Sequence, residues 1–162
     1  MAAGRQAAKE YARSSMGLSV RKSPWYVAGL AFECVGCGRC CAGPQEGYVW
    51  VTAEEISAIA EHLGLSEQQM RRRYVRKVGR RFSLIEREGS NDCVFLGHEA
   101  DGSRGCRIYP VRPLQCRTWP FWPSNLRDAD SWSDAASRCP GINRGPLHDV
   151  AEIEAKSRAT RE

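Results

Sequence analysis

Phe32-Glu-Cys34-Val-Gly-Cys37-Gly-Arg-Cys40-Cys41 is the stretch of sequence that decides how this chain folds. It places four thiols within eight positions, and Gly36 and Gly38 give the backbone the freedom that a tight turn between successive thiols needs. Thiols three residues apart can then turn to the same side of such a turn. The stretch therefore predicts a metal-binding knuckle.

Four more cysteines follow at spacings too long for a local turn, and they extend the candidate site to distant loops. The predicted metal ligands are Cys34, Cys37, Cys40, Cys41, Cys93, Cys106, Cys116 and Cys139. Adjacent side chains usually diverge, so Cys40 and Cys41 are expected to serve two centres, or to be one ligand and one structural thiol. Four thiolates suffice for a tetrahedral Zn²⁺ site or for a 4Fe-4S iron–sulfur cluster, and spacing alone does not choose between them.

The compartment decides whether eight cysteines form a metal site or an extracellular disulfide framework. Residues 1–19 alternate small, polar and basic types and hold no apolar run of a signal peptide, and no run of eighteen apolar residues occurs in the chain. We therefore expect a cytoplasmic protein without a membrane segment, in which the thiols stay reduced. A disulfide scaffold is the alternative. Phosphate-binding and dinucleotide motifs are lacking, so an enzyme here would have to rely on its metal.

The chain of 162 residues fits one domain, and its 15 glycines and 8 prolines predict a loop-rich one. We expect an α+β fold: a small irregular domain with two to four short helices and a few short strands organised around the cysteine metal site. The expected division is a polar N-terminal extension over 1–22, a cysteine-cluster metal-binding domain over 23–146, and a C-terminal helical tail over 147–162.

Local patterns place the expected elements along the chain. Thr52 to Glu55 and Ser66 to Gln69 are capping boxes that open two helices, which Gly64 and Gly79 end. Strands are expected over 47–51, 81–87 and 93–96, a polar loop over 97–105, a short helix carrying Cys116 after Pro113, and a closing helix over 148–161. His98 in the polar loop is a candidate nitrogen ligand, although a lone loop histidine more often faces solvent.

Other side chains near the cysteines have predicted supporting roles. Arg39, Arg107, Arg117 and Arg138 each adjoin a cysteine and could offset thiolate charge. Trp119, Phe121 and Trp122 are expected to form an apolar shell over the site, and a stacking platform for a substrate is the alternative.

A basic run in the second capped helix raises a different function. It comprises Arg71, Arg72, Arg73, Arg76, Lys77, Arg80 and Arg81. Such a run could grip a phosphate backbone, which would make the protein a nucleic-acid adaptor. Helical geometry spreads these charges around the helix, so a solvated face is the favoured interpretation and nucleic acid is not the expected partner.

The combined pattern resembles a known family. The resemblance is carried by Phe32-x-Cys-x-x-Cys-Gly-x-Cys-Cys41, Val49-x-Val-Thr-x-Glu-Glu-Ile56, Cys93-x-Phe-Leu96, Cys106-x-Ile-Tyr-x-x-Arg-Pro113, Cys116-Arg117 and Trp119-Pro-Phe121. Together these are similar to the YkgJ-type cysteine-cluster family, a CxxCxxCC zinc- or iron-chelating domain. The resemblance implies a small bacterial metal-binding domain, cytoplasmic in most members, that holds zinc or an iron–sulfur cluster. The metal ion or cluster is the expected partner, and a protein is a further candidate partner. Some longer relatives are named flagellin lysine N-methylases, which implies a metal-dependent methylase as the alternative function.

Overall fold

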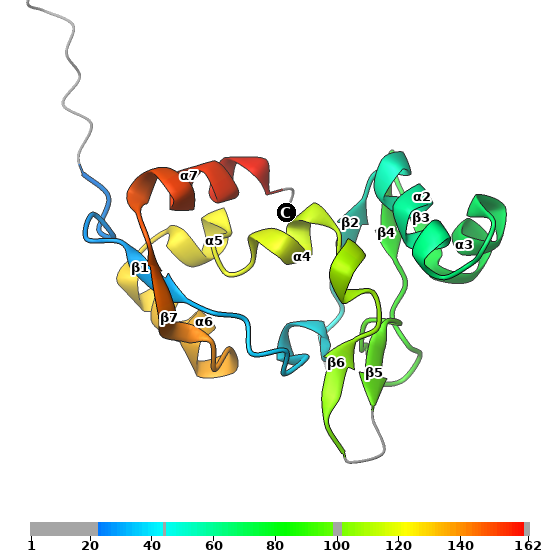
Figure 1. Cartoon of the computed structure of the whole chain (residues 1–162), viewed down its shortest axis with the longest axis horizontal. Coiled ribbons are helices and arrows are strands. Elements are labelled where there is room, and N and C mark those ends of the chain that lie inside the picture. The colour runs from blue at the N-terminus through cyan, green and yellow to red at the C-terminus, as the bar shows by residue number, and fades with distance from the viewer. Residues whose placement is uncertain (1–22, 44, 99–101, 161–162) are drawn as a thin grey trace, which may run out of the picture.

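Two small hydrophobic cores divide the chain into two packed halves, with the cysteine-rich loop between them (Figure 1). The computed structural model describes residues 23–43, 45–98 and 102–160. The expected N-terminal extension over 1–22 lies outside these residues. The fold is α+β and loop-rich, as the sequence predicts, with short strands in three small sheets.

The first half consists of a three-stranded antiparallel sheet in the order β2-β4-β3, two helices and a separate hairpin. Its elements are β2 (Val49–Val51), α2 (Ala53–His62), α3 (Glu67–Tyr74), β3 (Val75–Val78), β4 (Arg81–Leu84), β5 (Leu96–His98), β6 (Arg104–Cys106) and the 3₁₀ turn η2 (Tyr109–Val111). Its core contains Ile56, Ile59, Met70, Leu84, Phe95 and Ile108, which are all buried.

Both predicted capping boxes are present in the structure. Thr52 Oγ1 accepts from the Glu55 amide at 3.2 Å while a Glu55 carboxylate oxygen accepts from the Thr52 amide at 2.8 Å. Ser66 and Gln69 make the same pair of bonds at the start of α3. Each box satisfies two amides that would otherwise lack partners at a helix start, which is why the sequence located these two helices well.

The predicted extent of the second helix is wrong over residues 75–78. The helix ends at Tyr74, and Val75–Val78 forms β3 because Val75 pairs with Leu84 and Val78 with Arg81 across the sheet. The basic run is consequently divided among α3, β3 and β4 and does not follow one helix face.

The predicted return strand over 93–96 is also misplaced. Residue Glu86 makes a single bridge to Cys93, and the regular strand begins at Leu96, where β5 pairs with β6 inside the stretch expected to be a polar loop. Gly97 lies opposite Gly105, and a β-carbon on Gly97 would lie 3.3 Å from the Gly105 carbonyl oxygen, so glycine suits position 97 of this hairpin.

The second half joins the beginning and the end of the described chain. Its elements are β1 (Leu30–Phe32), α5 (Pro123–Leu126), α6 (Ala129–Arg138), β7 (Ile142–His148) and α7 (Val150–Ala159). The local patterns of the sequence assign no helix or strand to residues 124–145. The structure instead has α5 and α6, the latter capped by Asp128, followed by β7 paired antiparallel with β1.

The core of the second half is rich in aromatic rings. Phe121 is buried and stacks at 5.9 Å between ring centroids on Trp132, and the T-shaped contact of Phe32 with Phe121 has the same centroid distance. Ile153 brings α7 into this core, so the predicted closing helix is present and packs against the rest.

Helix α4 (Leu114–Thr118) lies between the halves and contacts β2 on one side and α7 on the other (Figure 1). Its Gln115 side chain accepts from the Trp50 amide at 2.8 Å and donates to the Tyr48 carbonyl at 3.0 Å, while the hydroxyl of Thr160, just after α7, donates to Thr118 at 2.7 Å. Because α4 carries Cys116, these bonds fix that thiol relative to both halves.

Candidate metal centre

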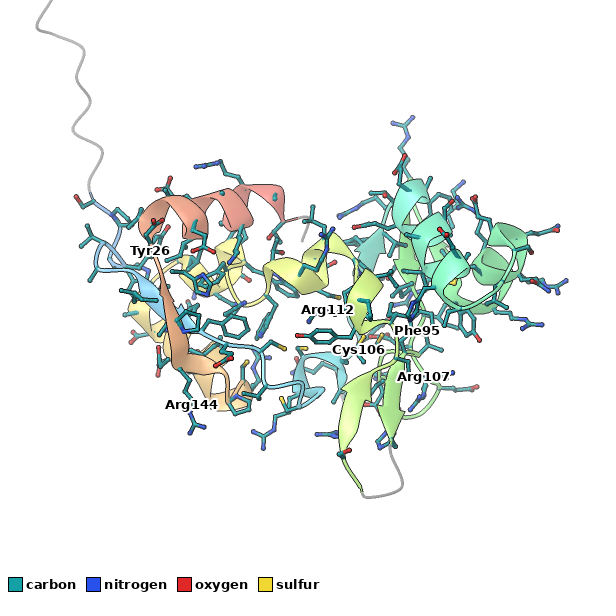
Figure 2. All side chains as sticks on the ribbon, in the orientation of Figure 1. Tyr26, Phe95, Cys106, Arg107, Arg112 and Arg144 are labelled. Atoms are coloured by element: carbon teal, nitrogen blue, oxygen red, sulfur yellow. The ribbon has the colours of Figure 1, made fainter. Side chains whose placement is uncertain are left out.

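The cysteine knuckle crosses from the second half to the first, and its thiols lie between the two cores. It leaves β1, turns through the 3₁₀ helix η1 (Arg39–Cys41) and continues into β2. Figure 2 places Cys106, at the end of β6, in the middle of the molecule between the halves.

The knuckle is fastened to the loop that carries Cys93. The Cys93 amide donates to the Cys41 carbonyl at 2.7 Å, and the Gly43 amide donates to the Asp92 carboxylate at 2.9 Å. A β-carbon on Gly43 would lie 1.9 Å from the Ser90 carbonyl oxygen, so only glycine permits this approach. The two loops are thus held backbone to backbone, which brings their thiols together.

The predicted ligands line two adjoining cavities that share Cys40, Cys41, Cys106 and Cys116. A cavity of about 40 Å³ is bordered in addition by Cys34, Cys37 and Cys139. A second cavity, of about 210 Å³, is bordered in addition by Cys93. Every one of the eight predicted ligands therefore faces at least one of the two cavities, and all eight are free thiols without a disulfide.

Cys41 lies at the centre of a group of four thiols that also contains Cys40, Cys93 and Cys106. Its Sγ lies 3.9 Å from Cys40 Sγ, although adjacent side chains were expected to diverge. Contacts with Cys106, Cys40 and Cys93 raise the pKa of Cys41, because this thiol keeps its proton as a hydrogen-bond donor. One S–H proton cannot serve three acceptors at once, so these contacts describe four sulfurs crowded around one point.

The pKa values of the thiols next to Cys41 shift in the opposite direction. The hydrogen bond with Cys41 lowers the pKa of Cys40 to about 7 and that of Cys106 to about 6, and it also lowers the pKa of Cys93. A low thiol pKa favours the thiolate, which is the form that binds metals.

The separation of the two adjacent sulfurs suits two ligands of one ion. Four sulfurs bound tetrahedrally at about 2.3 Å from a zinc ion lie about 3.8 Å from one another, and the Cys40–Cys41 distance is 3.9 Å. Among the described His, Cys, Asp and Glu side chains, however, no group of three or more is already arranged to hold a metal ion. Thiol-to-thiol hydrogen bonds would have to give way to sulfur–metal bonds through side-chain rotations.

The remaining thiols have more separate surroundings. Desolvation raises the pKa of Cys116 on α4, and the neighbouring Cys93, Cys40 and Cys106 raise it further. The Trp119 indole N–H points at Cys139 Sγ at 3.4 Å. This contact ties the last thiol of the sequence to the aromatic segment that precedes α5.

Arg112 is the functional residue that the sequence analysis missed. Its guanidinium lies 3.8 Å from the centroid of the Tyr109 ring, and its Nη1 is 4.0 Å from Cys34 Sγ. Its Nε is buried without a hydrogen-bond partner in the described part of the chain. Its positive charge adds to the Cys41 hydrogen bond in lowering the pKa values of Cys40 and Cys106, and it opposes the rise in the pKa of Cys116 that desolvation causes.

The four arginines that adjoin cysteines in sequence are exposed, and Arg112 is the one that lies against the thiols (Figure 2). The available signal was its place between two cysteines and directly before Pro113, a residue that restricts the preceding backbone to extended conformations. Position relative to the turn η2, and not adjacency to a cysteine, determines which arginine reaches the site.

The aromatic shell is present in part. Trp119 lines both cavities and Trp122 lines the larger one, with their rings 5.0 Å apart in an edge-to-face contact. The Trp122 indole donates to the Gln115 carbonyl at 2.9 Å. Phe121 belongs instead to the second core, so the expectation that it covers the metal site is wrong.

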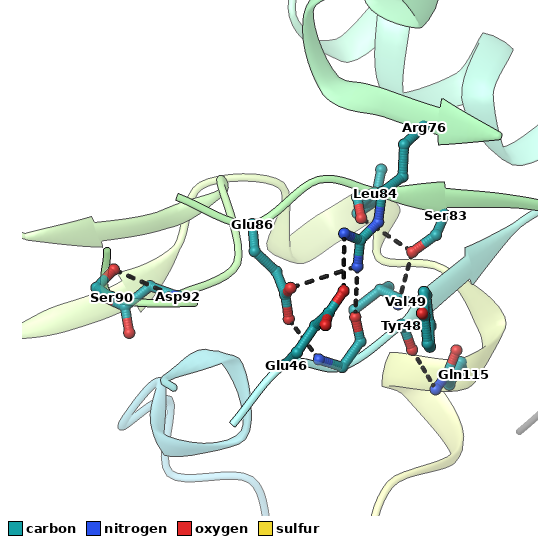
Figure 3. A network of polar contacts seen from close by, with 11 residues as sticks. Glu46, Tyr48, Val49, Arg76, Ser83, Leu84, Glu86, Ser90, Asp92 and Gln115 are labelled. Atoms are coloured by element: carbon teal, nitrogen blue, oxygen red, sulfur yellow. Dashed lines mark hydrogen bonds and ion pairs between the residues drawn. The ribbon is translucent and has the colours of Figure 1, made fainter. Parts of the chain in front are cut away.

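A polar network supports the wall of the larger cavity (Figure 3). Arg76 binds Glu86 at 3.3 Å and Glu46 at 3.2 Å, and it donates to the Gly47 carbonyl at 2.9 Å. The Glu86 carboxylate also accepts from the Gly47 amide at 2.7 Å. The network holds residues 46–49 in place beside the knuckle and uses one arginine of the predicted basic run for a structural purpose.

The chain belongs to the family described as "Putative zinc- or iron-chelating domain", with the CxxCxxCC motif, which matches residues 33–140. The family defines a metal-chelating cysteine domain and supports metal binding in general. One relative is an uncharacterized protein of Methanocaldococcus jannaschii, which is 33% identical over 96 residues. The aligned part covers 59% of this chain and 48% of the relative, so the chain spans about half the length of that protein.

No solved structure matches the chain. None of the helices in the described ranges is long and apolar enough to cross a membrane.

Proposed function

We propose that the protein binds Zn²⁺ or an iron–sulfur cluster through thiolates drawn from both of its halves. The observation that supports this function is that all eight cysteines line the two adjoining cavities. Thiolate sulfur is the donor that both zinc and iron–sulfur clusters take in proteins. The donor set therefore fits the metals that the family description names.

The group around Cys41 is the first binding site in this proposal. Cys40, Cys41, Cys93 and Cys106 supply four sulfurs, of which three have lowered pKa values. Cys41 would lose its proton on binding, since a ligand thiol must be deprotonated. Cys34, Cys37, Cys116 and Cys139 are then available for a second site or as alternative ligands beside the smaller cavity.

A bound closed zinc site would supply structural energy, whereas an iron–sulfur cluster would supply one-electron redox chemistry. The residues of the chain act around either group in the same way. Arg112 offsets thiolate charge, and the Trp119 and Trp122 rings limit the access of water from one side.

Anaerobic purification followed by metal and sulfide analysis tests the proposal. We expect stoichiometric zinc in colourless protein, or iron with equivalent sulfide and visible absorption. Cys41→Ser should lose most of the bound metal, because it removes the sulfur that contacts three others. His98→Gln is the matched control, since this exposed side chain faces neither cavity. Metal-free protein, or full metal retention in Cys41→Ser, would contradict the proposal.

A further inference from the structure

A third and larger cavity opens beside the thiols and is lined by arginines. Its volume is about 770 Å³, within the range of about 300–1,000 Å³ that is usual for small-molecule sites. It shares only Cys40 and Cys139 with the predicted ligand set, and its walls include Trp119 and Trp122. We refer to it as the arginine cavity.

Three exposed arginines from separate elements line this cavity: Arg39 of η1, Arg104 of β6 and Arg138 at the end of α6. The Arg104 side chain passes next to the knuckle, because a β-carbon on Gly38 would lie 3.4 Å from the Arg104 β-carbon. None of their guanidinium groups has a hydrogen bond or ion pair within the described ranges. Among the described residues, the fold thus brings three cations to one cavity without acidic partners.

The acidic side chain on the cavity wall does not cancel this charge. Glu46 lines the cavity, but its carboxylate is engaged by Arg76 at 3.2 Å from outside. The cavity therefore keeps a positive balance. Guanidinium groups bind phosphate and carboxylate oxygens through paired hydrogen bonds, and several arginines converging on one cavity favour a ligand with more than one negative charge.

We propose that the arginine cavity binds a small ligand that carries a diphosphate group. The chemistry goes beyond metal chelation, since the arginines are donors for oxygen anions and cannot ligate a metal cation. The indole rings of Trp119 and Trp122 meet edge to face at 5.0 Å, and they offer an apolar wall beside the charged one. A diphosphate attached to an aromatic ring could use both walls, and inorganic pyrophosphate only the charged one.

Titration calorimetry on the metal-loaded full chain, with ADP and with inorganic pyrophosphate as separate probes, tests this proposal. We expect saturable binding that weakens with salt, and a loss of about tenfold or more in affinity for each of Arg104→Gln and Arg138→Gln, since one charge-assisted contact contributes about 1.5–3 kcal/mol. If ADP binds more tightly than pyrophosphate and quenches tryptophan fluorescence, its adenine ring packs against the wall formed by Trp119 and Trp122. Equal affinities would assign binding to the diphosphate alone.

Arg72→Gln is the matched control, because Arg72 is an exposed arginine of α3 that does not line the cavity. The affinity of the Arg72→Gln variant for either probe should stay within about twofold of the affinity of the unchanged protein. Absence of saturable binding, or an equal loss in the control, would overturn the proposal. The proposal would also be overturned if Arg104→Gln and Arg138→Gln lost metal but kept their affinity for the probes. In that case the arginines would serve as counter-charges for the thiolates. Metal analysis of each variant separates this result from a failure of the metal centre itself.

Discussion

At the scale of single residues, the centre depends on how charge is distributed among close sulfurs. The contacts among these thiols raise the pKa of Cys41 and lower that of Cys40 to about 7 and that of Cys106 to about 6, which separates similar thiols into one that favours its proton and others that favour the thiolate. Arg112 contributes to this division as the cation next to the group. The sequence located the cysteines, but it could not show this arginine, because its contacts depend on how η2 is placed against the knuckle.

Arg112→Met should make Cys40 and Cys106 less acidic in metal-free, reduced protein. The hydrogen bond with Cys41 is the main cause of the low pKa values, and the Arg112 charge adds to it. Removing a nearby cation disfavours the thiolate, so the pH midpoint of alkylation at these cysteines should rise. Peptide mapping after iodoacetamide treatment at several pH values measures this shift.

Arg112→Lys is the control for this prediction. It keeps the positive charge, so most of the original alkylation midpoint should be retained, whereas the stacking contact with Tyr109 should weaken. Identical pH profiles for the methionine variant and the unchanged protein would show that the charge of Arg112 does not reach the thiols.

At the scale of elements, Glu55 has a role beyond capping α2. One carboxylate oxygen completes the capping box with Thr52, and the other accepts from the Leu114 amide at 2.7 Å. A single side chain therefore closes the start of α2 and the start of α4, the helix that carries Cys116. Local spacing in the sequence indicates the first role, but the second joins positions 59 residues apart and has no local signal.

Glu55→Ala should destabilise the protein more than Gln69→Ala. Gln69 occupies the same position in the second capping box, and its hydrogen bonds within the described residues are those of that box alone. Loss of a capping interaction costs about 1 kcal/mol, and the unpaired Leu114 amide adds about 1–3 kcal/mol. Urea unfolding of both variants in metal-loaded form measures the difference in the free energy of unfolding. Equal losses in the two variants would show that the bond to α4 adds nothing.

The helices and strands show where prediction from sequence succeeded and where it failed. Capping boxes are local hydrogen-bond patterns, so the starts of α2 and α3 were found to the residue. The Val75–Val78 segment has helical spacing of apolar residues and also the β-branched residues of a strand, and its pairing with β4 decided between them. Likewise, β7 exists because β1 lies beside it, and nothing in its own sequence predicts that partner.

At the scale of the whole molecule, α4 and the cysteine loops connect the two cores, with α4 in contact with both β2 and α7. Cys93 and Cys106 pack against the first core, and Cys139 packs against the second. A metal bound by cysteines of both groups would connect the two cores directly. A ligand that binds only the folded state adds stability in proportion to the logarithm of its free concentration, so the metal should contribute several kcal/mol when it is well above its dissociation constant.

Metal removal should therefore loosen the region between the halves before it unfolds either core. Chelation in reducing buffer should increase backbone hydrogen exchange at residues 34–41, where four of the predicted ligands lie, because this loop contains only the short turn η1 and few regular hydrogen bonds of its own. The amides of α2 should keep more of their protection, since Ile56 and Ile59 are buried in a core that does not need the metal. Hydrogen exchange followed by mass spectrometry, with and without chelator, measures both regions in one experiment.

In Cys41→Ser the ligand region should already exchange quickly and respond little to chelator, whereas His98→Gln should behave like the unchanged protein. Uniform loss of protection over α2 and the cysteine loops would show instead that the whole molecule unfolds as one unit when its metal is withdrawn.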